Sequence, residues 1–481
     1  MITPARPPGR PAAPYPNGQL SRPGAATRLK AMSSLVIGNR LPGPFAHRVV
    51  WFARSGDVVV LPSHPTGDFL DRVRRLAALP AGEPRIAVPP AGRQGAEWLD
   101  DDRLAVPGFV GELRMLAGAR GVDRVLPVRG DAAVHRLARA AGLDGPPGAA
   151  ADPAEQDGGL VGTPSQFRAV AGGTATPIPE GRVCAGPREA EDFVWRLLCG
   201  GRSALVRTGR GSEPGAADEL IVPVGGRPGA DAGTTVAIGD RETLAEYLDK
   251  NWRRYRGDEA SPVVVEHYIL DCGRLHIEFL AAPEGVSVLF HGHAPAAAPR
   301  DALVIPPRPE LVPDLADFIG QATQVMATVR DLGHIGYGSL DAALTPSGRV
   351  LFTGLTCGLS AATHLDAVAR LAVGTDYLDT RVLIVRDRVR WSALGAAEEV
   401  LAREGLGFDP RTRTGVLLTG DDLGAALGAG DGAVGGVRGP AGVFGPAGPS
   451  GQFLAVGRDH AHAGELEAGA LTALGAAAPA G

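Results

Sequence analysis

Short apolar runs alternate with amphipathic stretches along the first third of the chain. Four apolar runs end in glycine, proline or polar residues and predict buried strands: LVIGN, DVVVLPS, PRIAVPP and VDRVLPV. The other stretches have helical periodicity and predict helices: PFAHRVVWFARSG, DFLDRVRRLAAL, VGELRMLAGARG and DAAVHRLARAAGL. Strands that alternate with helices of about ten residues are typical of a parallel sheet, so we expect an α/β domain here.

The pattern changes after residue 166, where strands in hairpins predominate. A helix is predicted over residues 186–200, because its apolar positions share one side: Ala190, Phe193, Val194, Leu197 and Leu198. SALVRTGRGSEPGAADELIVPV predicts two strands around a glycine-bearing turn, and SPVVVEHYIL predicts another strand. Residues 333–364 predict two strands joined by a Pro-Ser-Gly turn, with Asp341 in the first of them.

These patterns divide the chain into five expected parts. A proline- and arginine-rich stretch without apolar periodicity predicts a disordered tail, and Met32 at its end is an alternative start to Met1. After it come the α/β domain, a small polar linker, a core, and a C-terminal α+β segment that contains a glycine-rich loop. The predicted bounds are 1–32, 33–150, 151–165, 166–380 and 381–481, with the loop at 428–451.

Composition and charge narrow the functions to consider. The 481 residues carry a net charge of −5, so electrostatics give no reason to expect a nucleic-acid partner. No apolar run approaches the ~20 residues that a membrane-spanning helix needs. The spacing of the four cysteines fits no zinc or redox pair, which favours free thiols in the cytoplasm. Lys30 and Lys250 are the only lysines, so a phosphate site would have to use arginine or backbone N–H groups.

The segment GHIGYGSLDAALTPSGRVLFTGLTCGLSAATH resembles the nucleotide-binding core of the ATP-grasp superfamily. In that core one strand carries an acidic residue, and the strand after a hairpin ends in a Glu-x-Asn-x-Arg run. Pro177, Pro179 and Gly181 resemble a second motif of the superfamily. The order of parts is similar to that of the pheganomycin-type peptide ligases. This resemblance implies a Rossmann-like pre-ATP-grasp domain, a two-lobed ATP-grasp core and a small C-terminal α+β segment.

The resemblance also implies that ATP binds between the two lobes. Arg207 stands where the family has its nucleotide-binding lysine, at the end of a predicted strand. Gly209 and Gly211 belong to the turn that would fold over the phosphates, because glycine lets backbone N–H groups approach phosphate oxygens. A plain flexible hairpin is the alternative interpretation of this turn.

Two further strands carry candidate nucleotide contacts. Glu266, His267 and Ile269 match the hinge positions that face the adenine in the family. His276 and Glu278 alternate onto one face of the next strand, where polar residues of the family approach the ribose and phosphates. An ordinary exposed strand face is the alternative for this second pair.

The metal motif departs from that of the family. Asp341 matches the first acid and is the predicted magnesium ligand, since magnesium binds oxygen. Thirteen positions later (354 − 341), Gly354 replaces the family's glutamate, and Thr356 and Gly358 replace the asparagine and the arginine. The predicted metal site therefore lacks three of its four functional groups.

The resemblance leaves two functions open. The first is an ATP- and Mg²⁺-dependent ligase of natural-product metabolism, which joins a small-molecule or peptide carboxylate to an amine through an acyl phosphate. Ser360, Thr363 and His364 would contact its substrates, although Thr363 equally suits a helix cap. The second, favoured by the degenerate motif, is a pseudoenzyme that binds nucleotide or peptide without turnover. Either function is compatible with a homo-oligomer.

Overall fold

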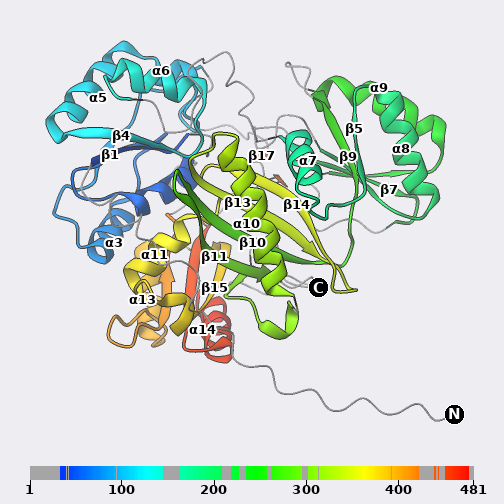
Figure 1. Cartoon of the computed structure of the whole chain (residues 1–481). Coiled ribbons are helices and arrows are strands. Elements are labelled where there is room, and N and C mark those ends of the chain that lie inside the picture. The colour runs from blue at the N-terminus through cyan, green and yellow to red at the C-terminus, as the bar shows by residue number, and fades with distance from the viewer. Residues whose placement is uncertain are drawn as a thin grey trace, which may run out of the picture.

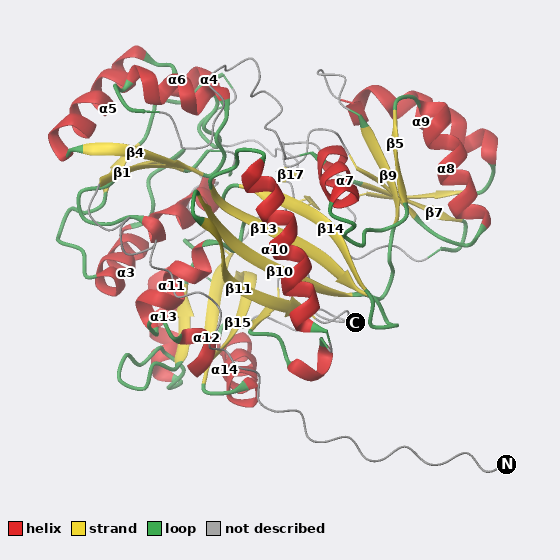
Figure 2. Cartoon of the chain, in the orientation of Figure 1, coloured by secondary structure: helices red, strands yellow, loops and turns green. Residues whose placement is uncertain are grey.

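The computed structural model of the chain describes residues 33–144 (except 40, 42 and 94), 163–207, 218–226, 234–256, 262–294, 302–421 (except 313 and 392), 438–439, 442–443 and 450–475. These residues form sheets of four, five and eight strands and a two-stranded ribbon, surrounded by helices (Figure 1, Figure 2). The ribbon consists of β17 (Arg438–Gly439) and β18 (Gly442–Val443). The predicted tail, most of the linker, Gly209, Gly211 and most of the glycine-rich loop lie outside the described residues.

The N-terminal part forms a four-stranded parallel sheet of order β3-β2-β1-β4. Its strands are β1 (Ser33–Ile37), β2 (Val58–Val60), β3 (Arg85–Ala87) and β4 (Val122–Pro127). Its α-helices are α2 (Gly43–Ala46), α3 (Gly67–Ala77), α4 (Asp101–Leu104), α5 (Pro107–Arg120) and α6 (Ala132–Ala140). The predicted parallel α/β arrangement is confirmed.

One predicted helix of this part is wrong in type. After the single turn of α2, the segment continues as the 3-10 helix η3 (His47–Phe52). Its residues from His47 to Trp51 are all buried, so the segment presents no solvated face. Tertiary packing, which overrides a weak helical preference, therefore determines its conformation.

The five-stranded sheet has the order β5-β9-β6-β7-β8. Its strands are β5 (Gly181–Cys184), β6 (Ala204–Arg207), β7 (Glu219–Pro223), β8 (Thr234–Ile238) and β9 (Val263–His267). Helices α8 (Pro187–Cys199) and α9 (Arg241–Arg256) share its hydrophobic core, and the five apolar positions predicted for α8 are all buried. Helix α7 (Pro164–Gly173) begins with a capping box formed by Thr163 and Gln166.

The eight-stranded sheet has the order β14-β13-β10-β11-β12-β15-β19-β16, with antiparallel neighbours. Its strands are β10 (Gly273–Ala282), β11 (Gly285–Ala294), β12 (Ala302–Ile305), β13 (Gly336–Leu344), β14 (Val350–Cys357), β15 (Val382–Arg390), β16 (Gly415–Leu418) and β19 (Ser450–Gly457). The C-terminal segment thus completes the same sheet as the core.

The remaining helices pack around this sheet. They are η5 (Pro309–Leu311), α10 (Leu315–Asp331), α11 (His364–Ala372), α12 (Tyr377–Thr380), α13 (Leu394–Arg403) and α14 (His460–Ala473). Helix α10 buries its apolar side against β10 and β13. In Figure 1 the N-terminal part lies at the upper left and the five-stranded sheet at the upper right, on either side of the eight-stranded sheet.

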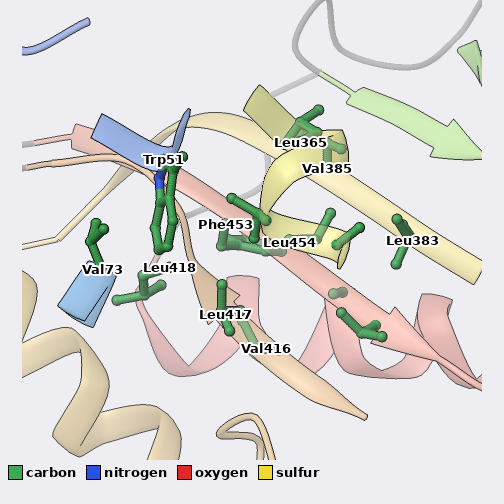
Figure 3. Close-up of a cluster of buried hydrophobic side chains, with 14 of the residues drawn as sticks. Trp51, Val73, Leu365, Leu383, Val385, Val416, Leu417, Leu418, Phe453 and Leu454 are labelled. Carbon is green, nitrogen blue, oxygen red and sulfur yellow. The ribbon is translucent and has the colours of Figure 1, made fainter. Parts of the chain in front are cut away.

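The N-terminal part and the eight-stranded sheet share one hydrophobic core. Trp51 and Val73 of the N-terminal part pack in the same cluster as Leu418 and Phe453 of the sheet (Figure 3). The Trp51 indole Nε1 also donates a hydrogen bond to the carbonyl of Thr419, over 2.8 Å. The two parts are therefore packed as one body. Within the described residues, no helix combines the length and the apolar character needed to cross a membrane.

Candidate functional site

Three neighbouring strands of the eight-stranded sheet bring the candidate polar residues to one face. His276 of β10 is the register partner of Asp341 on β13, and Asp341 is in turn the partner of Gly354 on β14. Because side chains alternate along a strand, positions two residues apart join the same face. That face carries His276, Glu278, Ser339, Asp341 and Thr356, with Gly354 between them. The opposite face packs under α10.

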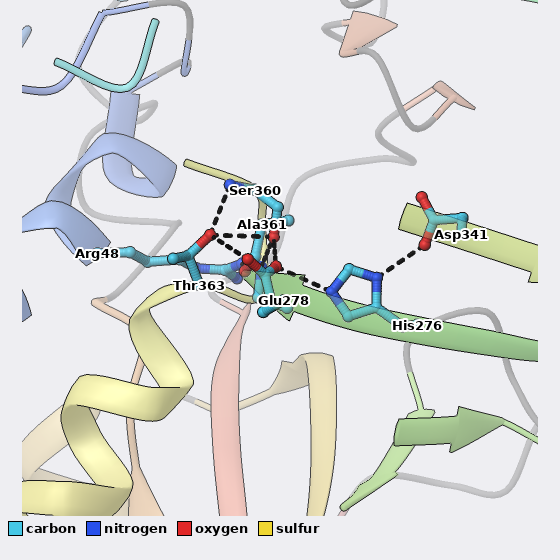
Figure 4. Close-up of polar contacts among 8 residues, drawn as sticks. Arg48, His276, Glu278, Asp341, Ser360, Ala361 and Thr363 are labelled. Atoms are coloured by element: carbon cyan, nitrogen blue, oxygen red, sulfur yellow. Dashed lines mark hydrogen bonds and ion pairs between the residues drawn. The ribbon is translucent and has the colours of Figure 1, made fainter. Parts of the chain in front are cut away.

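The His276 side chain bridges two carboxylates (Figure 4). Its Nδ1 lies 2.7 Å from Asp341 Oδ1, and its Nε2 lies 2.8 Å from Glu278 Oε1. Burial alone would lower the pKa of His276, but the two carboxylates outweigh it and raise the pKa to about 10. Desolvation by the surrounding protein would raise the pKa of Asp341, and the charge and hydrogen bond of His276 lower it instead. The Asp341 side chain is 55% exposed, and its Oδ2 would lie 3.9 Å from a Cβ built on Gly354.

Glu278 is fully buried and its oxygens are occupied by protein groups. Besides His276, the Ser360 hydroxyl and the Thr363 hydroxyl donate to it, the latter over 3.0 Å. The interpretation of Thr363 as a helix cap is wrong: it precedes α11, but its side chain caps no N–H group of that helix. Its hydroxyl instead accepts the N–H of Ser360 over 2.7 Å while it donates to Glu278. The buried carboxylate is the stronger acceptor and fixes this turn.

Arg207 joins the two lobes, which are the five-stranded sheet with its helices and the eight-stranded sheet. It ends β6, and its Nη1 lies 3.4 Å from Glu266 Oε1 and donates to the carbonyl of Thr353 on β14. A Cβ built on Gly354 would lie 3.9 Å from Arg207 Nη2 and 3.9 Å from Asp341 Oδ2. Arg207 of the five-stranded sheet and Asp341 of the eight-stranded sheet therefore face the same space.

Glu266 is held by two arginines. Arg168 of α7 places its Nη1 3.2 Å from Glu266 Oε2, on the side away from Arg207. Burial raises the pKa of Glu266, against the opposing effect of the two guanidinium groups. A Cβ on Gly181 would lie 2.6 Å from Arg168 Nη1, so the glycine of the Pro-x-Pro-x-Gly motif makes room for this arginine. Sequence reasoning missed Arg168, although its place in the helix before that motif was a usable signal.

The other hinge positions follow Glu266 along the chain. His267 ends β9, and its backbone N–H donates to the carbonyl of Glu180 over 2.7 Å. Burial lowers the pKa of His267. Ile269 lies two residues beyond and is half-buried. In the register of β9 with β6, His267 is the partner of Ala204 at the start of β6, while Arg207 at the end of β6 is the partner of Val264.

The donor set does not fit the magnesium site of the family. Asp341 supplies one carboxylate, Gly354 supplies no side chain, and Glu278 is already occupied. Gly358 has a φ of +123°, and a Cβ there would lie 2.3 Å from the Val128 carbonyl, so the arginine of the family motif cannot be accommodated. Within the described residues, no group of three or more His, Cys, Asp and Glu side chains is placed to hold a metal ion.

His364 and Arg48 lie behind the Ser360–Thr363 turn. His364 Nε2 is 2.6 Å from Gln452 Oε1, and burial, aided by Arg48, lowers the pKa of His364 to about 3. Arg48 of η3 contacts the Ala361 carbonyl over 3.4 Å and pairs with Asp387 over 2.6 Å. Arg48 was not predicted as a neighbour of the site, because it belongs to the N-terminal part. His364 is therefore a neutral residue that is 2% exposed.

Two sequence-based domain models match the chain. One is described as the Pre ATP-grasp domain and matches residues 46–143, and the other as the PGM1 C-terminal domain and matches residues 396–470. No curated protein sequence matches the chain.

Solved structures are similar over most of the chain. A biotin carboxylase from Campylobacter jejuni in an ATP complex has a TM-score of 0.53 and 11% identity, covering 92% of this chain and 91% of its own. An N5-carboxyaminoimidazole synthase from Aspergillus clavatus, in complex with ADP and 5-aminoimidazole ribonucleotide, has a TM-score of 0.51 and 12% identity, covering 92% of this chain and 99% of its own. An L-amino acid ligase from Bacillus licheniformis has a TM-score of 0.49 and 14% identity, covering 91% and 97%. The first two likenesses establish an ATP-grasp fold.

Proposed function

We propose that this chain, which has an ATP-grasp fold behind a pre-ATP-grasp domain, is an ATP-dependent carboxylate–amine ligase. The observation that carries the proposal is the position of Arg207, which ends β6 of one lobe and bonds to β14 of the other beside Asp341. Guanidinium groups form strong charge-assisted hydrogen bonds to phosphate. A triphosphate chain between the lobes would therefore meet Arg207, and the adenine would meet the backbone at Ile269, beyond the His267 N–H that the Glu180 carbonyl occupies.

The proposed reaction has two steps. A carboxylate oxygen attacks the γ-phosphorus of ATP, the bond to the bridging oxygen breaks, and ADP leaves. The amine nitrogen then attacks the acyl carbon of the acyl phosphate, inorganic phosphate leaves, and the nitrogen gives up a proton to form the amide. In this scheme Arg207 orients the phosphates. Glu278 holds the turn that contains Ser360 and Thr363, and this turn would border the carboxylate of the substrate. Both steps rely on positioning and charge neutralisation.

We infer an amino acid or peptide as the carboxylate substrate. The support is the resemblance of the order of parts to the pheganomycin-type peptide ligases, and a role in natural-product metabolism follows from the same resemblance. The test is incubation of the protein with ATP and pooled amino acids and dipeptides, with ADP release and the mass of new amides as readouts. ADP release that depends on one pool would support the ligase, and its absence from every pool would count against it.

A second candidate function is nucleotide or peptide binding without turnover. The observation that favours it is the incomplete family motif, in which Gly354 and Gly358 supply no side chain beside Asp341. Losing one well-placed transition-state donor costs ~10²–10³ in rate, so several losses can abolish turnover. Thermal stabilisation by ATP without ADP release from any pool would favour this binding function. The absence of both effects would exclude both functions.

A further inference from the structure

A serine, a histidine and an aspartate lie in series outside the candidate nucleotide site. Asp421 Oδ2 lies 2.7 Å from His47 Nδ1, and His47 Nε2 lies 3.1 Å from Ser63 Oγ. The aspartate follows β16, the histidine begins η3, and the serine lies between β2 and α3. This is the arrangement of a nucleophile, a general base within hydrogen-bond reach of it, and an acid that orients the base.

The contact with Asp421 determines which nitrogen of His47 carries the proton. Burial would raise the pKa of Asp421, but His47 and Thr66 lower it, so this carboxylate is ionised. An ionised carboxylate only accepts hydrogen bonds, so His47 Nδ1 must donate to it. In the neutral ring Nε2 then has a lone pair, to which the Ser63 hydroxyl can donate. The base is therefore directed at the serine oxygen.

The Ser63 carbonyl oxygen also lies 3.1 Å from His47 Nε2. A carbonyl only accepts, so it becomes a hydrogen-bond partner once Nε2 has taken up a proton. Together with Asp421, this oxygen would stabilise the imidazolium that forms when His47 takes the proton of the serine hydroxyl. The surroundings of His47 thus suit both the state before proton transfer and the state after it.

The serine differs in exposure from its two partners. His47 and Asp421 are each 2% exposed, whereas Ser63 is partly exposed and the next residue, His64, is exposed. Asp421 also accepts the N–H of Thr66 over 2.9 Å, so one carboxylate holds both the base and the loop that carries the serine. A fixed, buried base beside a serine that reaches the surface is suited to reaction with a molecule from solvent.

We propose that Ser63, His47 and Asp421 form a second catalytic site, which hydrolyses carboxylic esters. The site uses none of the residues of the proposed ligase, so it is independent of that function. Ser63 follows β2 at the carboxyl end of a parallel strand, where open α/β sheets bind their ligands. Esters are the substrate class, because their cleavage through an acyl-serine needs water as its only co-reactant.

The reaction has two steps that share one base. Ser63 Oγ forms a bond to the acyl carbon, the carbon–oxygen bond to the alcohol breaks, and His47 Nε2 passes the serine proton to the departing alcohol. Water then attacks the acyl carbon, and its proton passes through His47 to the departing Ser63 Oγ. Ester and water give carboxylic acid and alcohol. The Ser63 N–H, which donates to no protein acceptor within the described residues, would bind the oxyanion.

The first experiment treats the full chain with a fluorophosphonate probe and maps the modified peptides by mass spectrometry. An activated serine oxygen displaces fluoride from phosphorus, so we expect an adduct on Ser63. Ser347 is the internal control, because it is exposed between β13 and β14 and its hydroxyl contacts that of Thr345. Ser63 should react at least about a hundredfold faster than Ser347. An unmodified Ser63, or equal modification of the two serines, would overturn the proposal.

The second experiment measures hydrolysis of p-nitrophenyl acetate and of p-nitrophenyl esters with longer acyl chains. Ser63→Ala removes the nucleophile and keeps the contact between His47 and Asp421, so release of p-nitrophenol should fall at least about a hundredfold. Ser347→Ala is the matched control and should stay within about twofold of the unaltered protein. Hydrolysis that persists in Ser63→Ala, or its absence from the unaltered protein with every ester, would overturn the activity.

The third experiment removes the base. His47→Asn can still donate to Asp421 but cannot take up a proton, so we expect modification of Ser63 and ester hydrolysis to fall at least about a hundredfold. His64→Asn, which alters the exposed histidine beside the serine, should change neither rate by more than about twofold. Thermal melting checks that each variant folds, and if His47→Asn does not, the contrast between Ser63 and Ser347 decides. Unchanged reactivity in a folded His47→Asn protein, or an equal loss in both variants, would overturn the role of His47.

Discussion

His364 is a histidine that the fold keeps neutral. Burial, followed by the charge of Arg48, lowers its pKa to about 3, from the ordinary value of 6.5. Between these values the unfolded chain takes up a proton that the folded chain does not. The stability that depends on neutral His364 is therefore complete above pH 6.5 and decreases as the pH falls toward 3.

We expect this residue to make the protein sensitive to acid. At pH 5 the loss would be about 2 kcal/mol, from about 1.4 kcal/mol per pH unit. His364→Gln keeps a donor for Gln452 but has no proton to gain. Urea unfolding of both proteins at pH 7.5 and pH 5 measures the difference, and the acid-induced loss should be smaller in the variant by about this amount. An equal loss in both proteins would assign the acid sensitivity to other groups.

Gly358 shows how one position excludes a side chain. Its φ of +123° is unfavourable for any residue with a Cβ, and the added atom would lie 2.3 Å from the Val128 carbonyl. We expect Gly358→Ala to reduce the free energy of unfolding by about 2 kcal/mol or more. Gly354→Ala, with nothing closer than 3.9 Å, should change it by less than about 0.5 kcal/mol. Chemical denaturation measures the free energy of unfolding of both variants. Equally small changes in the two would contradict this prediction.

At the scale of elements, strand β6 carries the arginine that links the lobes. Arg207→Gln removes the charge-assisted bonds to Glu266 and Thr353 and the proposed phosphate contact. A charged hydrogen bond contributes about 1.5–3 kcal/mol, so we expect ATP affinity to fall at least about tenfold. Arg202→Gln, just before the same strand, breaks an exposed pair with Glu180 and should leave affinity within about twofold. Isothermal titration calorimetry with ATP compares the two variants. An equal loss of affinity in both would mean that Arg207 does not contact the nucleotide.

Most elements could be predicted because their periodicity is local. The four parallel strands, helix α8 with its buried side, and the hairpin that carries Asp341 all follow from apolar spacing and turn residues. The 3-10 conformation of η3 could not be predicted, because it depends on packing against the segment from several sides. The pairing of His276 with Asp341 depends on the register between β10 and β13, which are separated by more than fifty residues of chain. Arg48 enters the site region from the N-terminal part, so no local motif marks it. Arg168 lies in the helix before the Pro-x-Pro-x-Gly motif, but its pairing with Glu266 depends on how α7 packs against β9.

At the scale of the whole molecule, one buried carboxylate ties the N-terminal part to the eight-stranded sheet. Asp421 follows β16 and is 2% exposed. It lies 2.7 Å from His47 Nδ1, and accepts the N–H and the hydroxyl of Thr66 at 2.9 and 2.5 Å. Burial would raise the pKa of Asp421, but His47 and Thr66 lower it. Three donors from the first seventy residues thus converge on a group from the C-terminal third.

Replacing this carboxylate should loosen the contact between the two parts. Asp421→Asn removes the negative charge that strengthens all three bonds, and it turns an NH₂ group toward the Thr66 hydroxyl, which must then change from donor to acceptor. We expect a loss of about 2–4 kcal/mol in the free energy of unfolding. Asp317→Asn, an exposed acceptor on α10, is the control, with an expected change below about 0.5 kcal/mol.

Hydrogen exchange locates the effect of Asp421→Asn: protection should fall in η3, β2 and β16 and stay unchanged in β5, β6 and β9. An equal fall in the five-stranded sheet would mean that Asp421 stabilises the molecule as a whole, and an unchanged η3 would mean that the shared apolar core around Trp51 holds the contact without it.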